Sequence, residues 1–79
     1  MAWTKDIEGN LVNLERCGVI RALKVSNSDV WKILAYSEGN DQYPFAVLRE
    51  VNSKREIDIS LAIICNLVNP EKIELGTVN

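Results

Sequence analysis

The chain has 79 residues, of which 47% are apolar and 25% are charged, and its net charge is −2. This length predicts a single domain, residues 1–79, and the apolar content excludes a disordered chain. The absence of histidine excludes histidine metal ligation and histidine general-base catalysis. No basic run marks a nucleic-acid or anionic-membrane surface.

Two cysteines, Cys17 and Cys65, lie far apart in apolar surroundings and form no C-x-x-C motif. We expect two reduced, buried thiols in a cytoplasmic protein, rather than a disulfide or a zinc site. The segment MAWTKDIEGN contains acidic side chains and lacks the apolar core of a signal peptide. The apolar run 61–65 is too short to cross a bilayer. The sequence therefore predicts no membrane association.

Clusters of Gly, Asn, Asp and Ser are typical of turns, and they divide residues 3–51 into short strand-like segments. Segments 3–7 and 11–14 flank Gly9-Asn10 and predict a tight hairpin. Three longer segments with partly alternating side chains follow, at 18–25, 30–36 and 43–51. We predict an α+β fold in which four to five hairpin-connected strands form an antiparallel sheet, with one C-terminal helix packed on a face.

The predicted helix covers about residues 54–68. Ser53 and Glu56 have the S-x-x-E spacing of a capping box, which marks a helix start. Asn69-Pro70 marks its end, because Asn adopts the left-handed cap conformation and Pro disfavours helix in the residue before it. Residues 70–79 would form a C-terminal arm, with a short strand, a docked segment and a frayed end as the alternatives.

This helix carries more apolar side chains than one face can hold. At about 100° per residue, one stripe is the natural contact with the sheet: Ile57, Leu61, Ile64 and Val68. A second stripe lies on another side: Ile59, Ile63 and Leu67. Leaving these three side chains in water would forgo roughly 1.5–3 kcal/mol each. We expect a second copy to cover them in a homodimer; the alternatives are that the C-terminal arm folds over them or that they stay exposed.

Few residues point to chemistry. Nucleophile-elbow, phosphate-loop, dinucleotide-binding and EF-hand motifs do not occur, so no catalytic, cofactor-binding or metal site is predicted.

Single-stranded nucleic-acid binding across the sheet is the alternative function, because aromatic side chains beside basic ones can stack bases. Its residues would be Lys32, Tyr43, Phe45 and Arg49. The acidic net charge disfavours it, and core packing is the ordinary role of Trp31. A small enzyme or ligand-binding protein with its site at a subunit interface is a third hypothesis.

Trp3-x5-Gly9-x-Leu11-Val12-Asn13-Leu14, followed by Ile20 and by Trp31-x-Ile33-x-Ala35, resembles a group of small uncharacterised bacterial proteins. The resemblance covers about residues 3–36 and implies a small sheet-plus-helix domain with no assigned activity. This chain departs from that pattern in its more apolar helix and in the tail after Pro70. In layout alone, it is also similar to the Whirly and transcriptional-coactivator single-strand DNA binders, which form dimers.

Overall fold

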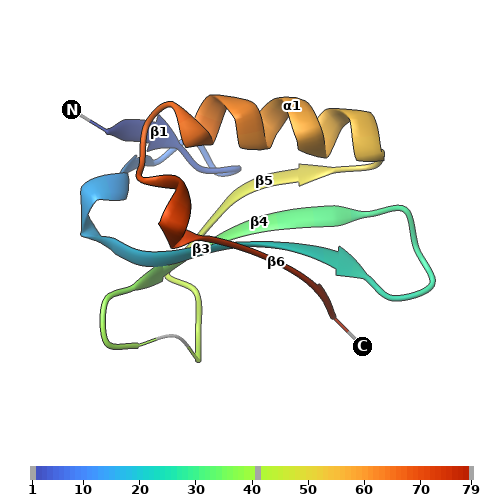
Figure 1. The fold of residues 1–79 in the computed structure, drawn as a ribbon, viewed down its shortest axis with the longest axis horizontal. Coiled ribbons are helices and arrows are strands. Elements are labelled where there is room, and N and C mark those ends of the chain that lie inside the picture. Colours follow the sequence, from blue (N-terminus) through green and yellow to red (C-terminus); the bar gives the residue numbers. More distant parts are fainter. Residues whose placement is uncertain (1, 41, 79) are drawn as a thin grey trace.

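The computed structural model describes residues 2–40 and 42–78. The main sheet has four strands (Figure 1). In spatial order they are β5 (Ala46–Val51), β4 (Trp31–Ser37), β3 (Cys17–Val25) and β6 (Ile73–Val78). The helix α1 (Lys54–Cys65) lies across one face of this sheet. The fold is therefore α+β, with one helix packed on a sheet, as predicted.

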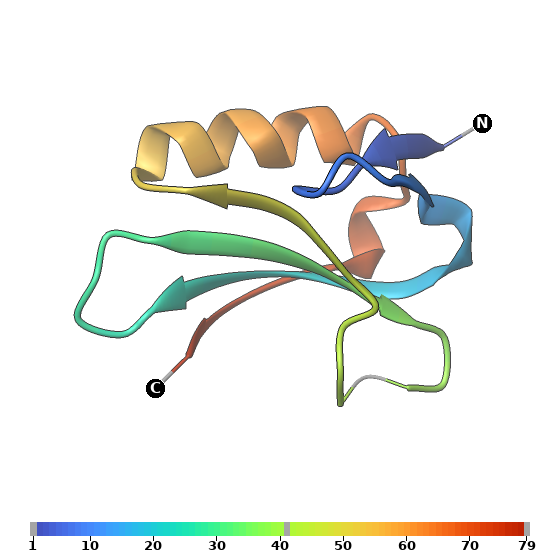
Figure 2. The ribbon, with the colours of Figure 1, turned by 180° about the vertical axis from the view of Figure 1, so that it is seen from behind.

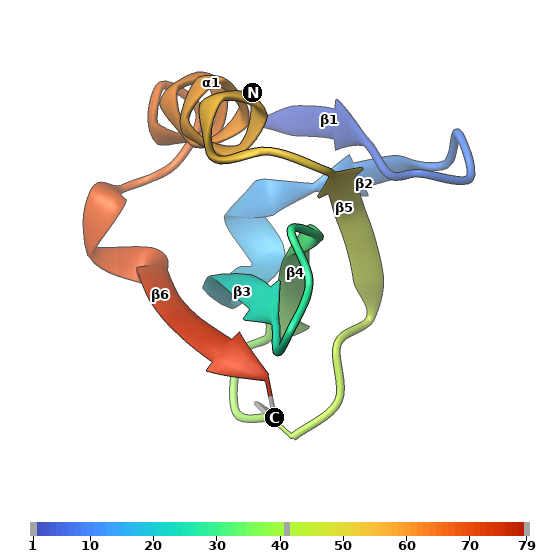
Figure 3. The same cartoon turned by 90° about the vertical axis from the view of Figure 1, so that its right-hand side faces the viewer.

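A separate two-stranded hairpin consists of β1 (Trp3–Lys5) and β2 (Leu11–Asn13). It lies beside the helix, on the same side of the main sheet (Figures 2 and 3). The turn between its strands contains Gly9 at φ +87°, a conformation that glycine adopts without strain. The sequence thus predicted the hairpin but not its separation from the main sheet.

The main sheet is mixed, so the purely antiparallel sheet predicted from the sequence is wrong. β3, β4 and β5 are neighbours connected by hairpins and pair antiparallel. β6 instead runs parallel to β3, with Ile20 opposite Ile73 and Leu23 opposite Gly76. After β5 the chain crosses the sheet as α1 and returns at the far edge, which is the connection that parallel strands require (Figure 3).

The start of α1 is capped by Ser53, as the sequence predicts, but the returning bond of Glu56 is made with Asn52 rather than with Ser53. The Ser53 hydroxyl accepts a hydrogen bond from the Glu56 N–H at 3.2 Å, and the Glu56 carboxylate accepts one from the Asn52 N–H. The helix ends at Cys65, earlier than the predicted residue 68. Asn69 accounts for part of this difference, because its side chain caps the short 3-10 helix η2 (Pro70–Lys72) rather than α1.

The core lies between α1 and the main sheet. Ile57 and Ile64 are 1% and 2% exposed and Leu61 packs against the same cluster, which confirms these three members of the first stripe. Val68 also packs against the core but lies beyond the end of α1. From the sheet, the fully buried side chains are Cys17, Ile20, Ala22, Ile33, Ala35 and Leu48. Trp31 packs against this core, in agreement with its predicted role. Leu14, in the 3-10 helix η1 (Leu14–Arg16), closes the core beneath the hairpin.

The C-terminal arm is a strand, which was one of the three predicted alternatives. Residues 73–78 pair with β3, so they do not fold back over the second helix stripe. Ile73 packs against the core, whereas the Leu75 side chain is 71% exposed. Cys17 and Cys65 are both free; Cys17 is buried and Cys65 is partly buried. Burial raises the pKa of the Cys17 thiol.

Candidate interaction surfaces

The side of α1 that faces away from the sheet carries an apolar patch. Ile59 and Ile63 lie one turn apart, and each is 53% exposed. Ala62, between them, is also exposed. We call Ile59, Ala62 and Ile63 the outer helix patch. It is bordered by three exposed polar residues: Arg55, Glu56 and Asn66. An apolar centre inside a polar rim is the usual anatomy of a protein interface.

Leu67 does not belong to this patch. It lies beyond the end of α1, and its N–H donates to the Ile64 carbonyl at 2.9 Å in the closing turn. The chain therefore leaves the helical path, and the Leu67 side chain packs against the core. Two of the three residues predicted for the second stripe thus share one exposed surface, and the third contributes to folding.

The four residues predicted for a nucleic-acid surface do not converge. Lys32 lies beside Glu50, 3.9 Å away, where β4 begins and β5 ends. Tyr43 and Phe45, 74% and 48% exposed, lie in the loop before β5, at the opposite end of that strand. Arg49 points to the hairpin instead. The structure thus brings together no basic and aromatic pair among these four residues.

Arg49 fastens the hairpin to the main sheet. Its guanidinium donates hydrogen bonds to the Lys5 carbonyl at 2.6 Å and to the Thr4 hydroxyl at 3.3 Å. A register shift in the β4–β5 pairing puts Arg49 opposite the buried Ile33, and therefore on the helix side of the sheet. Strict alternation along β5 could not have revealed this role, because one extra residue in a strand reverses the side chains that follow.

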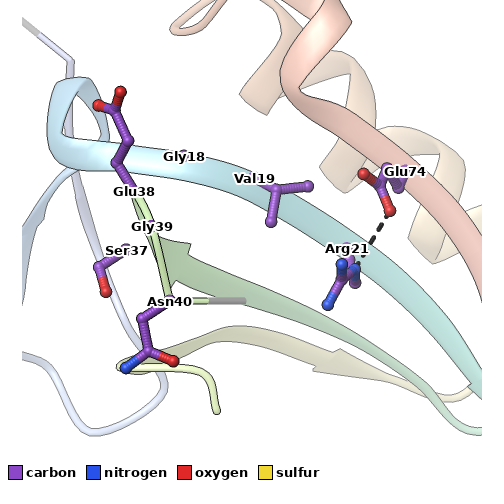
Figure 4. Close-up of a pocket in the computed structure, with 8 residues that line it drawn as sticks. All are labelled: Gly18, Val19, Arg21, Ser37, Glu38, Gly39, Asn40 and Glu74. Carbon is purple, nitrogen blue, oxygen red and sulfur yellow. Dashed lines mark hydrogen bonds and ion pairs between the residues drawn. The ribbon is translucent and has the colours of Figure 1, made fainter. Parts of the chain in front are cut away.

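A hollow of about 360 Å³ lies where β3 extends beyond the start of β6. It is lined by Gly18, Val19, Arg21, Glu74 and the turn 37–40 (Figure 4). The Arg21 Nε donates to the Glu74 carboxylate at 3.2 Å, and the Arg21 guanidinium lies 4.6 Å from the centre of the Tyr36 ring. The hydrogen bond to Glu74 raises the pKa of Arg21.

Sequence reasoning missed this hollow because its two charged residues lie far apart in the chain. Only the parallel register of β3 and β6 places Arg21 opposite Glu74. The hollow offers an ion pair, the amide of Asn40 and the hydroxyl of Ser37. These groups can hold a polar side chain or a small polar ligand, but they include no nucleophile activated by a neighbouring base.

Within residues 2–40 and 42–78, no group of three or more acidic or cysteine side chains is arranged to hold a metal ion. The described helix is too short to span a membrane. The fold and its surfaces therefore define a small α+β domain with an exposed apolar helix face. Comparison with known proteins finds no matching family model, no matching curated protein and no matching solved structure. The resemblance seen in residues 3–36 stays a prediction.

Proposed function

We propose that the protein is a non-enzymatic protein-interaction module that forms a homodimer through the outer helix patch. The observation that carries this proposal is the half-exposure of Ile59 and Ile63 on the side of α1 away from the core. Burying the exposed half of each side chain would gain about 1 kcal/mol per residue. The C-terminal arm leaves the patch uncovered because it is committed to the sheet.

A second copy is the simplest partner for this surface. Two antiparallel helices related by a two-fold axis would bring the same apolar residues together and leave both polar rims in water. We propose a cytoplasmic location for this dimer, which the two free thiols support. Single-stranded nucleic-acid binding stays a prediction. Its four residues do not lie together on one surface, so their arrangement gives it no support.

The test is the mass of the protein in solution, measured by light scattering over a range of concentrations. We expect a dimer for the wild type and a monomer for Ile63→Glu, because a carboxylate at the centre of an apolar interface loses its hydration. Ile63 is half-exposed, so the variant should keep the circular dichroism spectrum of the folded chain.

Leu11→Glu is the matched control, because Leu11 is also an exposed aliphatic residue, 67% accessible, but lies on the hairpin. It should leave the mass unchanged. A monomeric wild type at about 100 μM, well above the Kd of a stable dimer, would overturn the proposal. So would an Ile63→Glu protein that keeps the wild-type mass.

A further inference from the structure

The two edges of the main sheet differ in how far their outward backbone groups are covered. At the β5 edge, the chain that follows β1 lies against the strand, and the Ile7 N–H donates to the Val47 carbonyl at 2.9 Å. Arg49 adds a hydrogen bond from its guanidinium to the Leu48 carbonyl at 2.6 Å. Pro44 precedes the strand, where it offers no N–H to a further strand. This edge is therefore covered at Val47 and Leu48, which hinders the addition of a further strand.

The β6 edge has none of these protections. One side of β6 pairs with β3 in unbroken register, so alternate N–H and C=O groups point outward from the sheet. In the described part of the chain, no backbone hydrogen bond reaches this outer side. The strand also lacks the proline, lysine or bulge that commonly blocks a sheet edge. It is the one long, regular edge that the described fold leaves open.

The side chains of this edge suggest what would pair with it. Leu75, on the helix side of the strand, is 71% exposed and would be covered by an apolar side chain of an added strand. On the other side, Glu74 is exposed and borders the hollow beside β3. Added strands obtain affinity from backbone hydrogen bonds and specificity from such alternate side-chain contacts.

The most exposed charged side chains of this edge are acidic. The exposed charged side chains along η2 and β6 are Glu71 and Glu74. Lys72, between them, is partly buried, and its positive charge opposes the rise that burial causes in the pKa of the Cys17 thiol. Arg21 pairs with Glu74 but is 24% exposed and lies on the inner strand β3, whereas Glu74 is 57% exposed and lies on the edge strand. Basic side chains on the sheet side opposite the helix would therefore complement the edge, whereas acidic ones would be repelled.

We propose that the β6 edge binds an extended segment of a partner protein in which apolar residues alternate with lysine or arginine. The segment adds to the main sheet as a fifth strand beside β6. Its apolar side chains cover Leu75, and its basic side chains lie beside Glu74. This surface is distinct from the outer helix patch, so the homodimer and the segment can be bound at the same time.

The test uses the synthetic peptide acetyl-(Val-Lys)3-amide and the ¹⁵N-labelled full chain. We expect chemical-shift changes at β6 and along the neighbouring β3, and none for the acidic peptide acetyl-(Val-Glu)3-amide. Leu75→Lys should weaken binding about fivefold, since it replaces the apolar cross-strand pair of Leu75 and a valine by a charged side chain against a valine. Leu11→Lys adds the same charge at an equally exposed leucine on the hairpin and should bind as the wild type does.

Two N-methylated peptides test the backbone pairing directly. Methylation of all the lysine nitrogens or of all the valine nitrogens blocks opposite edges of the added strand. One of these peptides should therefore lose binding while the other keeps it. Equal binding of both, equal binding of the acidic peptide, shifts at α1 or β5, or no binding at millimolar peptide would overturn the proposal. Concentration-dependent shifts at β6 without peptide would overturn it in favour of a second copy of this chain.

Discussion

At the scale of single residues, Gly18 is required by the close approach of two backbone segments. A Cβ atom at this position would lie 2.7 Å from the Cα of Glu38, in the turn after β4. We expect Gly18→Ala to lower the free energy of unfolding by about 1–3 kcal/mol, because backbone rather than a flexible side chain must move. Urea denaturation measures this change.

Gly76→Ala is the matched control for Gly18→Ala. Its Cβ would lie 3.1 Å from the end of the Leu23 side chain, which can rotate away. The control should therefore cost less than Gly18→Ala. Equal losses of stability would show that the packing of the turn against β3 is looser than described.

Asp6 stabilises the hairpin turn in a pH-dependent way. One carboxylate oxygen accepts hydrogen bonds from the N–H groups of Asn10 and Glu8, both at 2.9 Å. These bonds, led by that of Asn10, hold the pKa of Asp6 below its ordinary value of 3.8. Because the folded pKa is depressed, the stabilisation is complete above the unfolded pKa and is lost as the pH falls through the folded one.

We therefore expect the Asp6 carboxyl carbon to titrate below pH 3.8 in an NMR experiment on the folded protein. The amides of Glu8 and Asn10 should shift with the same midpoint, since they donate to this carboxylate. A midpoint at or above 3.8, or amides that do not follow the carboxylate, would contradict this account of the turn.

At the scale of elements, the parts that sequence predicted correctly depend on near neighbours in the chain. The Ser53–Glu56 cap and the stripe beginning at Ile57 involve residues a few positions apart, so local spacing was sufficient. The predicted end of α1 was too late because Asn69 was expected to cap the C-terminus of α1, whereas it caps the N-terminus of η2. The local sequence is compatible with both capping roles and does not decide between them.

The path of the C-terminal arm could not be derived in the same way. Ile73 and Leu75 alternate with charged residues, which is compatible with a strand but names no partner. The partner is β3, more than fifty positions earlier, and pairing with it makes the sheet mixed. Such pairings are selected by the whole core rather than by the segment itself. For the same reason, the spacing of residues around the helix predicted that Ile59 and Ile63 share a face, whereas no spacing in the sequence predicted the hollow beside β3.

At the scale of the whole molecule, the fold closes one sheet edge with its hairpin and leaves the other open. The clamp between hairpin and sheet is Arg49, whose guanidinium reaches Lys5 and Thr4. Hydrogen bonds that involve a charged group contribute about 1.5–3 kcal/mol, less where water competes, as it does for the partly exposed Arg49. Removing the clamp should therefore loosen the hairpin without unfolding the core.

We expect Arg49→Met to lower stability by about 1 kcal/mol and to accelerate hydrogen exchange at the Ile7 amide, which bonds to Val47. Lys32→Met is the control, because it removes only an exposed ion pair with Glu50, which contributes little. A molecule with a loosened hairpin has two bare edges instead of one, and bare edges pair between molecules. Arg49→Met should thus aggregate at concentrations where Lys32→Met stays soluble; identical exchange and solubility of the two variants would show that Arg49 does not hold the edge closed.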